Sequence, residues 1–360
     1  MMADNTANVI DMEEQRAARS GERPRCQATT TRGDRCRNYA VEDGYCRIHA
    51  PEPPPSSRRD EPEHRPSGGI DLLEGLRDAL GDDWLDELKD VASFLRRRLT
   101  GDYDVDEFGF DADLTEHVLV PLLRPLHRYY WRVGSSGAEN IPDGAGMIVA
   151  NHAGTLPADA LMTRLDLFEH TGRHARELGA DLVFRLPFVG ELGRKTGATL
   201  AAGDDADRLL ERGELVAVWP EGFKGIGKPF KDRYKLQRFG RGGFVATALR
   251  AQAPIIPTAI VGSEEIYPLL YNLKTIAKVF GLPYFPVTPQ LLAFPFLGPV
   301  GLLPFPTKWF IEYGEPIDTS DYGPEAAEDP MVVFDLTDRV RETIQQMIYK
   351  NLMGRRSVFF

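Results

Sequence analysis

The sequence predicts an α/β domain in which helices flank a sheet. Short apolar runs of strand length alternate with longer stretches whose apolar residues recur at helical spacing. The chain has 360 residues, of which 42% are hydrophobic. That is enough for a substantial core, and for one large domain with appended segments. Strands are expected at 147–150, 182–184, 198–201, 215–219, 255–261 and 309–313.

Helical patterns bracket these strands. Apolar spacing over 70–99 predicts a helical pair that leads into the main domain, and 329–352 predicts a closing amphipathic helix. The stretch 114–131 combines an apolar stripe with basic and aromatic edges. This pattern is typical of a helix at a membrane interface, and an ordinary packing helix shows much the same stripe.

Two polar segments each follow an apolar run. Asn151-His-Ala-Gly-Thr-Leu-Pro-Ala-Asp159 follows the first, and Pro220-Glu-Gly-Phe-Lys224 follows the second. Because α/β folds present catalytic groups at the C-terminal edge of their strands, the two segments are expected to meet. A histidine at position 152 can take a proton near neutral pH. From 222 to 250 there are eight Lys or Arg and one acid, which favours an anion-binding loop over a solvated helix face.

In order along the chain, these segments resemble motifs of the glycerolipid acyltransferase family. The family carries Asn-His-x4-Asp, then Phe-Pro-Glu-Gly-Thr-Arg, then an apolar Pro-Ile-x-Pro strand, which Ala253-Pro-Ile-Ile-Pro257 matches. The segment 186–197 is similar to the family's Pro-x2-Gly segment. The resemblance covers roughly residues 115 to 350. It implies a glycerolipid acyltransferase-like sheet with flanking helices.

Two departures from the family pattern concern the site. His152 and Asp159 are separated by six residues where the family has four, and Gly-Phe-Lys-Gly stands where the phosphate-acceptor branch has Gly-Thr-Arg. Both departures lean toward the subgroup that resembles monoacylglycerol and diacylglycerol acyltransferases. The identity of the acyl acceptor stays open.

The resemblance implies transfer of a fatty acyl group to the hydroxyl of a glycerolipid or lysophospholipid. The donor would be an acyl-thioester of coenzyme A or of acyl carrier protein. His152 would act as general base, with Asp159 fixing its tautomer. The substrate-binding candidates are Asn151, Gly154, Thr155, Glu221, Gly222, Lys224, Lys228 and Arg238.

Two other functions remain as alternatives. One is a hydrolase acting on the same thioester or ester, although the chain lacks a Gly-x-Ser-x-Gly elbow. The other is a non-enzymatic protein that binds lipid or nucleic acid. A net charge of −11 argues against a general nucleic-acid binder.

The stretch 279–307 is uncharged and long enough to cross a membrane, but it contains seven prolines, which forbid a continuous spanning helix. Its aromatic and leucine side chains either fill the core beneath a long loop, or form a surface at a lipid interface or an acyl-chain tunnel. Because the first 20 residues form no secretory signal, the expected location is cytoplasmic, peripheral on the inner face of the cell membrane.

The N-terminal region predicts a separate metal-binding module. Cys26, Cys36, Cys46 and His49 provide a closed tetrahedral set for a structural zinc ion, with free thiols as the alternative. The segment resembles small Cys3His modules, and its arginines offer contacts to nucleic acid, anionic lipid or an acidic partner. The expected organisation is a disordered 1–22, the module at 23–50, a disordered tether acting as flexible linker at 51–69, a helical lead-in at 70–114 and the acyltransferase domain at 115–352.

Overall fold

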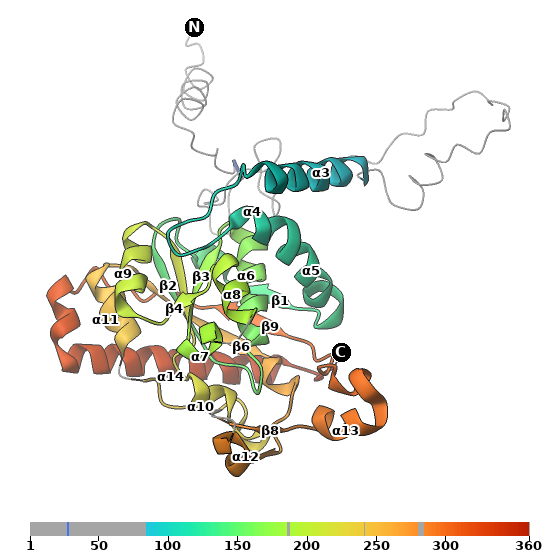
Figure 1. Cartoon of the computed structure of the whole chain (residues 1–360). Helices are drawn as coiled ribbons and strands as arrows, with labels where there is room; N and C mark the ends of the chain where they lie inside the picture. The colour runs from blue at the N-terminus through green and yellow to red at the C-terminus, as the bar shows by residue number, and fades with distance from the viewer. Residues whose placement is uncertain (1–26, 29–83, 186–187, 241, 280–283, 360) are drawn as a thin grey trace, which may run out of the picture. The chain divides into compact units, whose positions relative to one another are not determined.

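The computed structural model describes residues 27–28, 84–185, 188–240, 242–279 and 284–359 (Figure 1). The chain divides into two compact units, 1–103 and 104–360. In the first unit, helix α3 (Trp84–Thr100) occupies part of the region where a helical pair is predicted. The predicted disordered start, linker and Cys3His module lie outside the described residues, apart from positions 27 and 28.

The described part of the second unit is built on a seven-stranded sheet of order β1-β9-β6-β2-β5-β3-β4. Neighbouring strands run parallel, except that β6 and β9 are antiparallel. A small antiparallel pair, β7-β8, lies outside this sheet. The strands are β1 (Gly134–Ser136), β2 (Gly146–Ala150), β3 (Ala175–Gly179), β4 (Thr199–Leu200), β5 (Leu215–Val218), β6 (Ile255–Val261), β7 (Tyr271–Asn272), β8 (Pro286–Val287) and β9 (Phe310–Tyr313).

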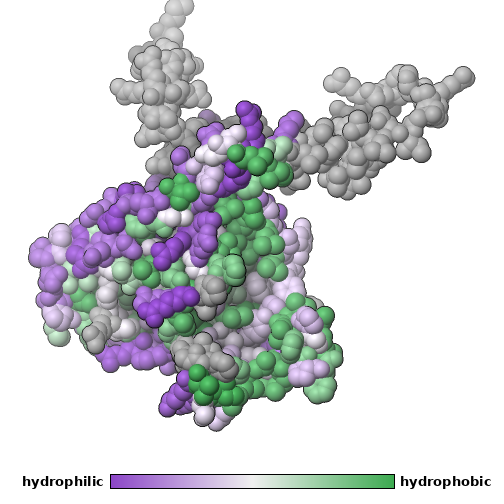
Figure 2. Space-filling view, in the orientation of Figure 1, coloured by the Kyte–Doolittle hydropathy of each residue, from purple (hydrophilic) through white to green (hydrophobic). Residues whose placement is uncertain are grey.

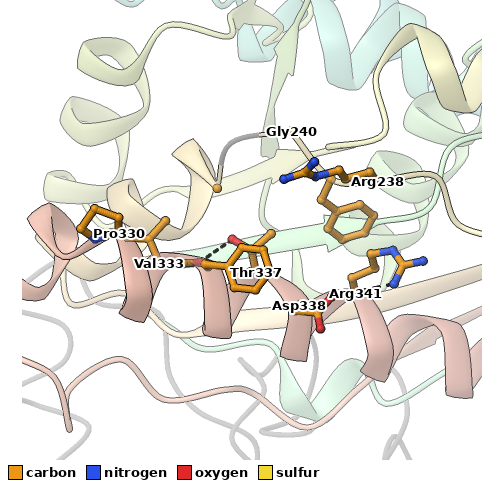
Figure 3. A pocket seen from close by; sticks show the side chains of 10 residues that line it. Arg238, Gly240, Pro330, Val333, Thr337, Asp338 and Arg341 are labelled. Atoms are coloured by element: carbon orange, nitrogen blue, oxygen red, sulfur yellow. Dashed lines mark hydrogen bonds and ion pairs between the residues drawn. The ribbon is translucent and has the colours of Figure 1, made fainter.

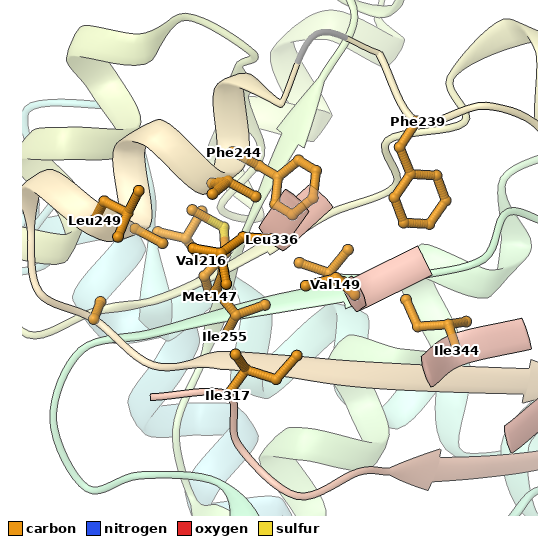
Figure 4. Close-up of a cluster of buried hydrophobic side chains, with 14 of the residues drawn as sticks. Met147, Val149, Val216, Phe239, Phe244, Leu249, Ile255, Ile317, Leu336 and Ile344 are labelled. Atoms are coloured by element: carbon orange, nitrogen blue, oxygen red, sulfur yellow. The ribbon is translucent and has the colours of Figure 1, made fainter. Parts of the chain in front are cut away.

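Helices cover both faces of the large sheet (Figure 1). Met147 and Val149 on β2 face a core formed with α9 (Gly203–Glu211), α11 (Gly243–Arg250) and α14 (Pro330–Gly354) (Figure 4). Ile148 and Ala150 face a second core formed with α5 (Val120–Pro125) and α6 (Ala158–Thr171). Because successive strand residues point to opposite faces, a continuous apolar run such as β2 serves both cores. The sheet with flanking helices confirms the predicted α/β class.

The predicted helix at 114–131 is present as a continuous helical run. It consists of α4 (Ala112–Leu114), η1 (Thr115–Leu119), α5 and η2 (Leu126–Tyr130), of which η1 and η2 are π-helical. The wide turn of η2 follows directly on Pro125, which has no N–H to donate to the preceding turn. At the other end of the domain, Asp329 caps α14 by accepting a 2.8 Å hydrogen bond from the N–H of Met331.

One predicted strand is wrong. Residues 182–184 belong to helix α7 (Asp181–Arg185), and the strand of this region is β3, at 175–179. A three-residue apolar run is too short for its period to separate strand from helix. Strand β1 went unpredicted because its Gly-Ser-Ser sequence carries no apolar signal. Helix α8 (Val189–Lys195) follows α7.

The stretch 279–307 is not the long loop that the sequence analysis expects. After α12 (Lys274–Val279), its described part contains β8, α13 (Pro289–Leu297) and the 3-10 helix η6 (Gly298–Leu302). Thr288 caps α13 and Pro289 occupies the first turn, where a missing N–H costs nothing. No helix within the described residues is long and apolar enough to cross a membrane. The remaining short helices are η3 (Ala138–Asn140), α10 (Phe223–Ile226), η4 (Phe230–Asp232), η5 (Ser263–Glu265) and η7 (Pro324–Glu328).

Candidate active site

The C-terminal end of β2 leads into the candidate site, and Asn151 fixes that end. Its side-chain nitrogen donates to the carbonyl oxygen of Ile260 at 2.9 Å, and its side-chain oxygen accepts from the N–H of Ile260 at 2.7 Å. Asn151 is fully buried. The side-chain amide of Asn151 therefore joins β2 to β6. Both of its polar atoms are used in this contact and are not open to a substrate.

His152 meets Asp159 across the loop that connects β2 to α6. The imidazole Nδ1 lies 2.7 Å from Oδ2 of Asp159, and the same oxygen accepts from the N–H of Ala153 at 2.7 Å. Asp159 lies in the first turn of α6 and is fully buried. The longer spacing along the chain thus still brings the carboxylate to the imidazole.

This contact sets the protonation pattern of the imidazole. A carboxylate only accepts hydrogen bonds, so Nδ1 carries the proton and Nε2 keeps its lone pair. Nε2 forms no hydrogen bond within the described residues. His152 is 8% exposed. An imidazole whose orientation and tautomer are fixed by a buried acid is suited to act as a general base.

The loop between His152 and Asp159 is held in an unusual conformation at Thr155. Its φ is +68°, a left-handed value that costs free energy for a β-branched residue. The N–H of Thr155 donates to Ile226 at 2.8 Å, its hydroxyl donates to the carbonyl of Tyr267 at 2.9 Å, and its own carbonyl accepts from the hydroxyl of Tyr284 at 2.5 Å. These bonds hold the turn that returns Asp159 to the imidazole. Burial raises the pKa of Tyr284 to about 12, so this phenol remains a donor.

The loop after β5 braces the histidine through Glu221. Its Oε1 accepts from the N–H of His152 at 3.0 Å, and its Oε2 accepts from the N–H of Gln237 at 2.6 Å. Glu221 is buried. Both carboxylate oxygens are occupied by the protein itself, so Glu221 positions the histidine loop and is not open to a substrate.

Lys228 is buried between two carboxylates. Its Nζ lies 3.3 Å from Oε2 of Glu221 and 3.1 Å from Oε2 of Glu264. Burial raises the pKa of Glu264 to about 7, against the lowering effect of Lys228 and with a further rise from Glu221. A single buried lysine between two carboxyl groups favours protonation of one of the two carboxyl groups. The raised pKa of Glu264 indicates that Glu264 carries this proton. Lys228, a predicted substrate-binding residue, is therefore part of the internal support of Glu221.

Two glycines shape the turn that begins α10. Gly222 has φ +54° and ψ −143°, a conformation that essentially only glycine adopts. At Gly225, an added Cβ would lie 2.7 Å from Cβ of Glu221 and 2.9 Å from Cβ of His152. Helix α10 can approach the histidine this closely only because that residue has no side chain. Lys224, between the two glycines, is exposed to solvent.

Arg238 is brought to a different place. It is exposed and lines a cavity of about 290 Å³ between residues 238–240 and 242 on one side and helix α14 on the other (Figure 3). Arg341 and Asp338 line the same cavity from α14. The cavity contains neither His152 nor Asp159 among its lining residues. Arg238 thus lines a cavity to which His152 and Asp159 do not contribute.

The sequence analysis missed three residues of this site: Gly225, Glu264 and Tyr284. Glu264 lies three residues after the last residue of β6, and an acid close to the end of a strand next to β2 is a signal that was available. Gly225 and Tyr284 gave no such signal, because their importance depends on contacts across the fold.

No cluster of three or more His, Cys, Asp or Glu that would suit a metal occurs within the described ranges, and the predicted zinc ligands lie outside them.

The chain is similar to known proteins over most of its length. Residues 132–261, which include the whole His152–Asp159 loop and Glu221, match the acyltransferase family. Uncharacterized proteins of Mycobacterium bovis and Mycobacterium leprae are each 55% identical to the chain and align with 84% of it, covering 84% and 83% of their own lengths. The chain therefore contains a domain of the acyltransferase family. Residues 23–60 match a domain of unknown function (DUF5763), which coincides with the cysteine-containing segment.

More distant relatives of the chain carry descriptive names. A human protein named DGAT1/2-independent enzyme synthesizing storage lipids is 25% identical over 216 residues, 60% of each chain. Among solved structures, the 1-acyl-sn-glycerophosphate acyltransferase PlsC of Thermotoga maritima matches 67% of this chain and 82% of its own, with a TM-score of 0.43 and 20% identity.

Proposed function

We propose that this acyltransferase moves a fatty acyl group from an acyl-thioester to the hydroxyl of a glycerolipid or lysophospholipid. One observation carries the proposal: Nδ1 of His152 is bound at 2.7 Å by a buried carboxylate, within the matched acyltransferase region. The free Nε2 has the position and tautomer that a general base requires. The donor is a thioester of coenzyme A or of acyl carrier protein.

The proposed reaction needs no covalent enzyme intermediate. Nε2 of His152 takes the proton of the acceptor hydroxyl while the hydroxyl oxygen bonds to the thioester carbonyl carbon. Asp159 stabilises the resulting imidazolium. Backbone amides or a nearby cation stabilise the oxyanion of the tetrahedral intermediate. The intermediate then breaks its C–S bond, and the departing thiolate recovers the proton from His152.

The acceptor is proposed to be a lipid alcohol of the neutral glycerolipid type, with phosphate-bearing acceptors as the second class. The Gly-Phe-Lys-Gly segment and the named human storage-lipid enzyme support the first class. The exposed Lys224, which lies on α10 beside the histidine loop, suits a phosphate of either acceptor or donor. We propose that the enzyme acts as a peripheral protein on the inner face of the cell membrane, where such a substrate would be met.

The test is incubation of the purified chain with labelled acyl-thioester and separate acceptors. The panel contains lysophosphatidic acid, glycerol 3-phosphate, monoacylglycerol and diacylglycerol, each with both thioester carriers. His152→Ala is expected to lower turnover by about 10² to 10⁴ in protein that still shows a cooperative melting transition. His117→Ala, a change in η1 at a partly exposed histidine, is the matched control. Near-parent turnover in His152→Ala would sink the mechanism.

The same assay separates the alternatives. Release of free fatty acid without a lipid acceptor would identify a hydrolase, and no turnover of any thioester would favour a binding protein. Lys224→Ala should raise KM for a phosphate-bearing acceptor and leave a neutral acceptor less affected. Lys231→Ala, at another exposed lysine, is its control. Equal effects on both acceptor classes would assign Lys224 to the donor.

We also propose that Cys26, Cys36, Cys46 and His49 hold one structural zinc ion. Three thiolates and an imidazole suit tetrahedral zinc, and a segment this short needs a metal to fold. The match of residues 23–60 to one domain family supports a unit of its own. Its arginines are proposed to contact an acidic partner, nucleic acid or anionic lipid.

A further inference from the structure

Helix α13 exposes its apolar side chains to solvent, unlike an ordinary helix of a globular domain. Its one buried residue is Gln290, while its large apolar side chains face solvent. Phe296 is 85% exposed, and Val300 in the adjoining η6 is 67% exposed. A soluble helix normally buries its apolar stripe. We call the exposed residues of α13, η6 and the following turn the α13–η6 surface: Leu292, Phe296, Leu297, Val300 and Leu303.

The α13–η6 surface is firmly attached at its base. Gln290 donates to the carbonyl of Ile266 at 2.8 Å, and the N–H of Phe305 donates to the same carbonyl at 2.9 Å. The hydroxyl of Tyr130 in η2 donates to Pro304 at 2.5 Å. These contacts hold both ends of the segment against the domain. The outward apolar side chains are therefore presented by an ordered element, and Figure 2 shows the mostly apolar surface over α13.

The charge pattern around this surface indicates its partner. No Asp, Glu, Lys, Arg or His occurs from 279 to 307. Exposed lysines flank the stretch at 274, 278 and 308. An apolar surface within an uncharged stretch that is flanked along the chain by exposed lysines fits a bilayer with anionic headgroups, because apolar groups leave water while lysines can approach phosphate.

The same surface is connected to the candidate active site through Tyr267. The hydroxyl of Tyr267 donates to the carbonyl of Leu302 at the end of η6 at 2.8 Å. Its backbone carbonyl accepts the hydroxyl of Thr155, in the loop between His152 and Asp159, at 2.9 Å. A single residue thus joins the apolar surface to the loop of the general base. A bilayer that receives α13 and η6 would lie on the side of the molecule where that loop is found.

We propose that the α13–η6 surface inserts into the headgroup and upper acyl region of an anionic phospholipid leaflet, and that lipid acceptors reach the His152 loop from this leaflet. The route of the acceptor rests on the proposed function. Membrane insertion itself requires no catalysis. The partner is therefore a lipid surface, and the lysines on either side of the stretch make anionic lipid the preferred kind.

The experiment measures cosedimentation of the full chain with vesicles, in the absence of acyl donor. Vesicles of phosphatidylcholine with phosphatidylglycerol are compared with vesicles of phosphatidylcholine alone. Phe296→Asp should reduce partitioning into the anionic vesicles about ten- to hundredfold, because a charge replaces an aromatic side chain that would enter the bilayer. Phe296→Leu should keep partitioning close to the parent. The parent should bind vesicles of phosphatidylcholine alone more weakly.

Met331→Asp is the matched control, since Met331 is 67% exposed and lies at the start of α14, beside η7. It should partition like the parent, and all variants should keep the parent melting transition. The proposal is overturned if the parent does not bind vesicles, if Phe296→Asp binds as well as the parent, or if Met331→Asp loses as much. Vesicle binding with this pattern but no acyl transfer to any acceptor would refute the proposed function and leave the insertion surface standing.

Discussion

At the scale of single residues, the site is a histidine supported from two sides. Asp159 holds the imidazole at Nδ1, while Glu221 holds the backbone of the same residue. Lys228 and Glu264 lie behind Glu221 and keep its charge balanced in a buried position. The support is a chain of buried ionisable groups. Substitution of any member is expected to act on His152 through its position.

Asp159→Asn tests the orientation of the base. An amide can present its N–H to Nδ1, which favours the tautomer with the proton on Nε2 and removes the base. By analogy with the Ser-His-Asp triad, kcat is expected to fall by about 10⁴ with little change in KM. Steady-state kinetics on the preferred acceptor measures the effect. A loss of less than about tenfold would show that another group or water orients His152.

Glu264→Gln tests the buried acid pair by pH. The pKa of Glu264 is raised from 4.5 to about 7, so the folded chain binds the proton more tightly than the unfolded chain. The stabilising contribution of that proton is complete below about pH 4.5 and is lost as the pH rises through about 7. The melting temperature of the parent should therefore fall relative to that of Glu264→Gln as the pH rises from about 5 to about 8. A difference that stays constant with pH would contradict the assignment of the proton to Glu264.

At the scale of elements, the site depends on how closely a short helix approaches a loop. Helix α10 contacts the backbone of the His152 loop through the bond from Thr155 to Ile226. Gly225 allows this approach, and the backbone of Gly222 sets the direction of the chain before the helix. The element therefore positions the loop, while its exposed Lys224 is left available for a substrate.

Gly225→Ala tests this close approach. The new methyl group would clash with side-chain carbons of both Glu221 and His152, so α10 must move away from the loop. Because small displacements of catalytic groups are costly, turnover is expected to fall by about 10². Gly144→Ala, where an added Cβ meets nothing within 4 Å, should keep parent activity. Parent-like turnover in Gly225→Ala would show that the loop tolerates a wider spacing.

At the scale of the whole molecule, the chain consists of two units that the sequence separates by composition. All three cysteines lie within the first 50 residues, and the acyltransferase match begins at 132. The described catalytic unit contains its own two cores, one on each face of the sheet. It is therefore expected to fold without help from the N-terminal segment.

Cys46→Ser tests the independence of the two units. Protein purified under reducing conditions should carry one zinc per chain by metal analysis, and the variant should release it. The melting transition of the catalytic unit and acyl transfer to a soluble acceptor should stay at parent values. Absence of zinc from the parent protein would rule out the metal site. Loss of core activity in Cys46→Ser would show that the module supports catalysis.

The sequence by itself determined the α/β class, most of the strands and the acyltransferase domain, because burial of apolar runs and ordered local motifs are written along the chain. It also named His152 and Asp159. It placed the 182–184 strand wrongly and expected a loop where α13 forms, since short apolar runs and prolines suit either structure.

Only the tertiary structure decided what each polar residue contacts. Glu221 and Lys228 were expected to face a substrate, yet they are buried together with Glu264. Their partners come from segments that are distant in sequence, so residue spacing along the chain does not predict these contacts. The turn at Thr155 that returns Asp159 to His152 likewise depends on bonds from Tyr267 and Tyr284. Motifs thus specify which chemical groups are present, and long-range packing decides which of them are free to act.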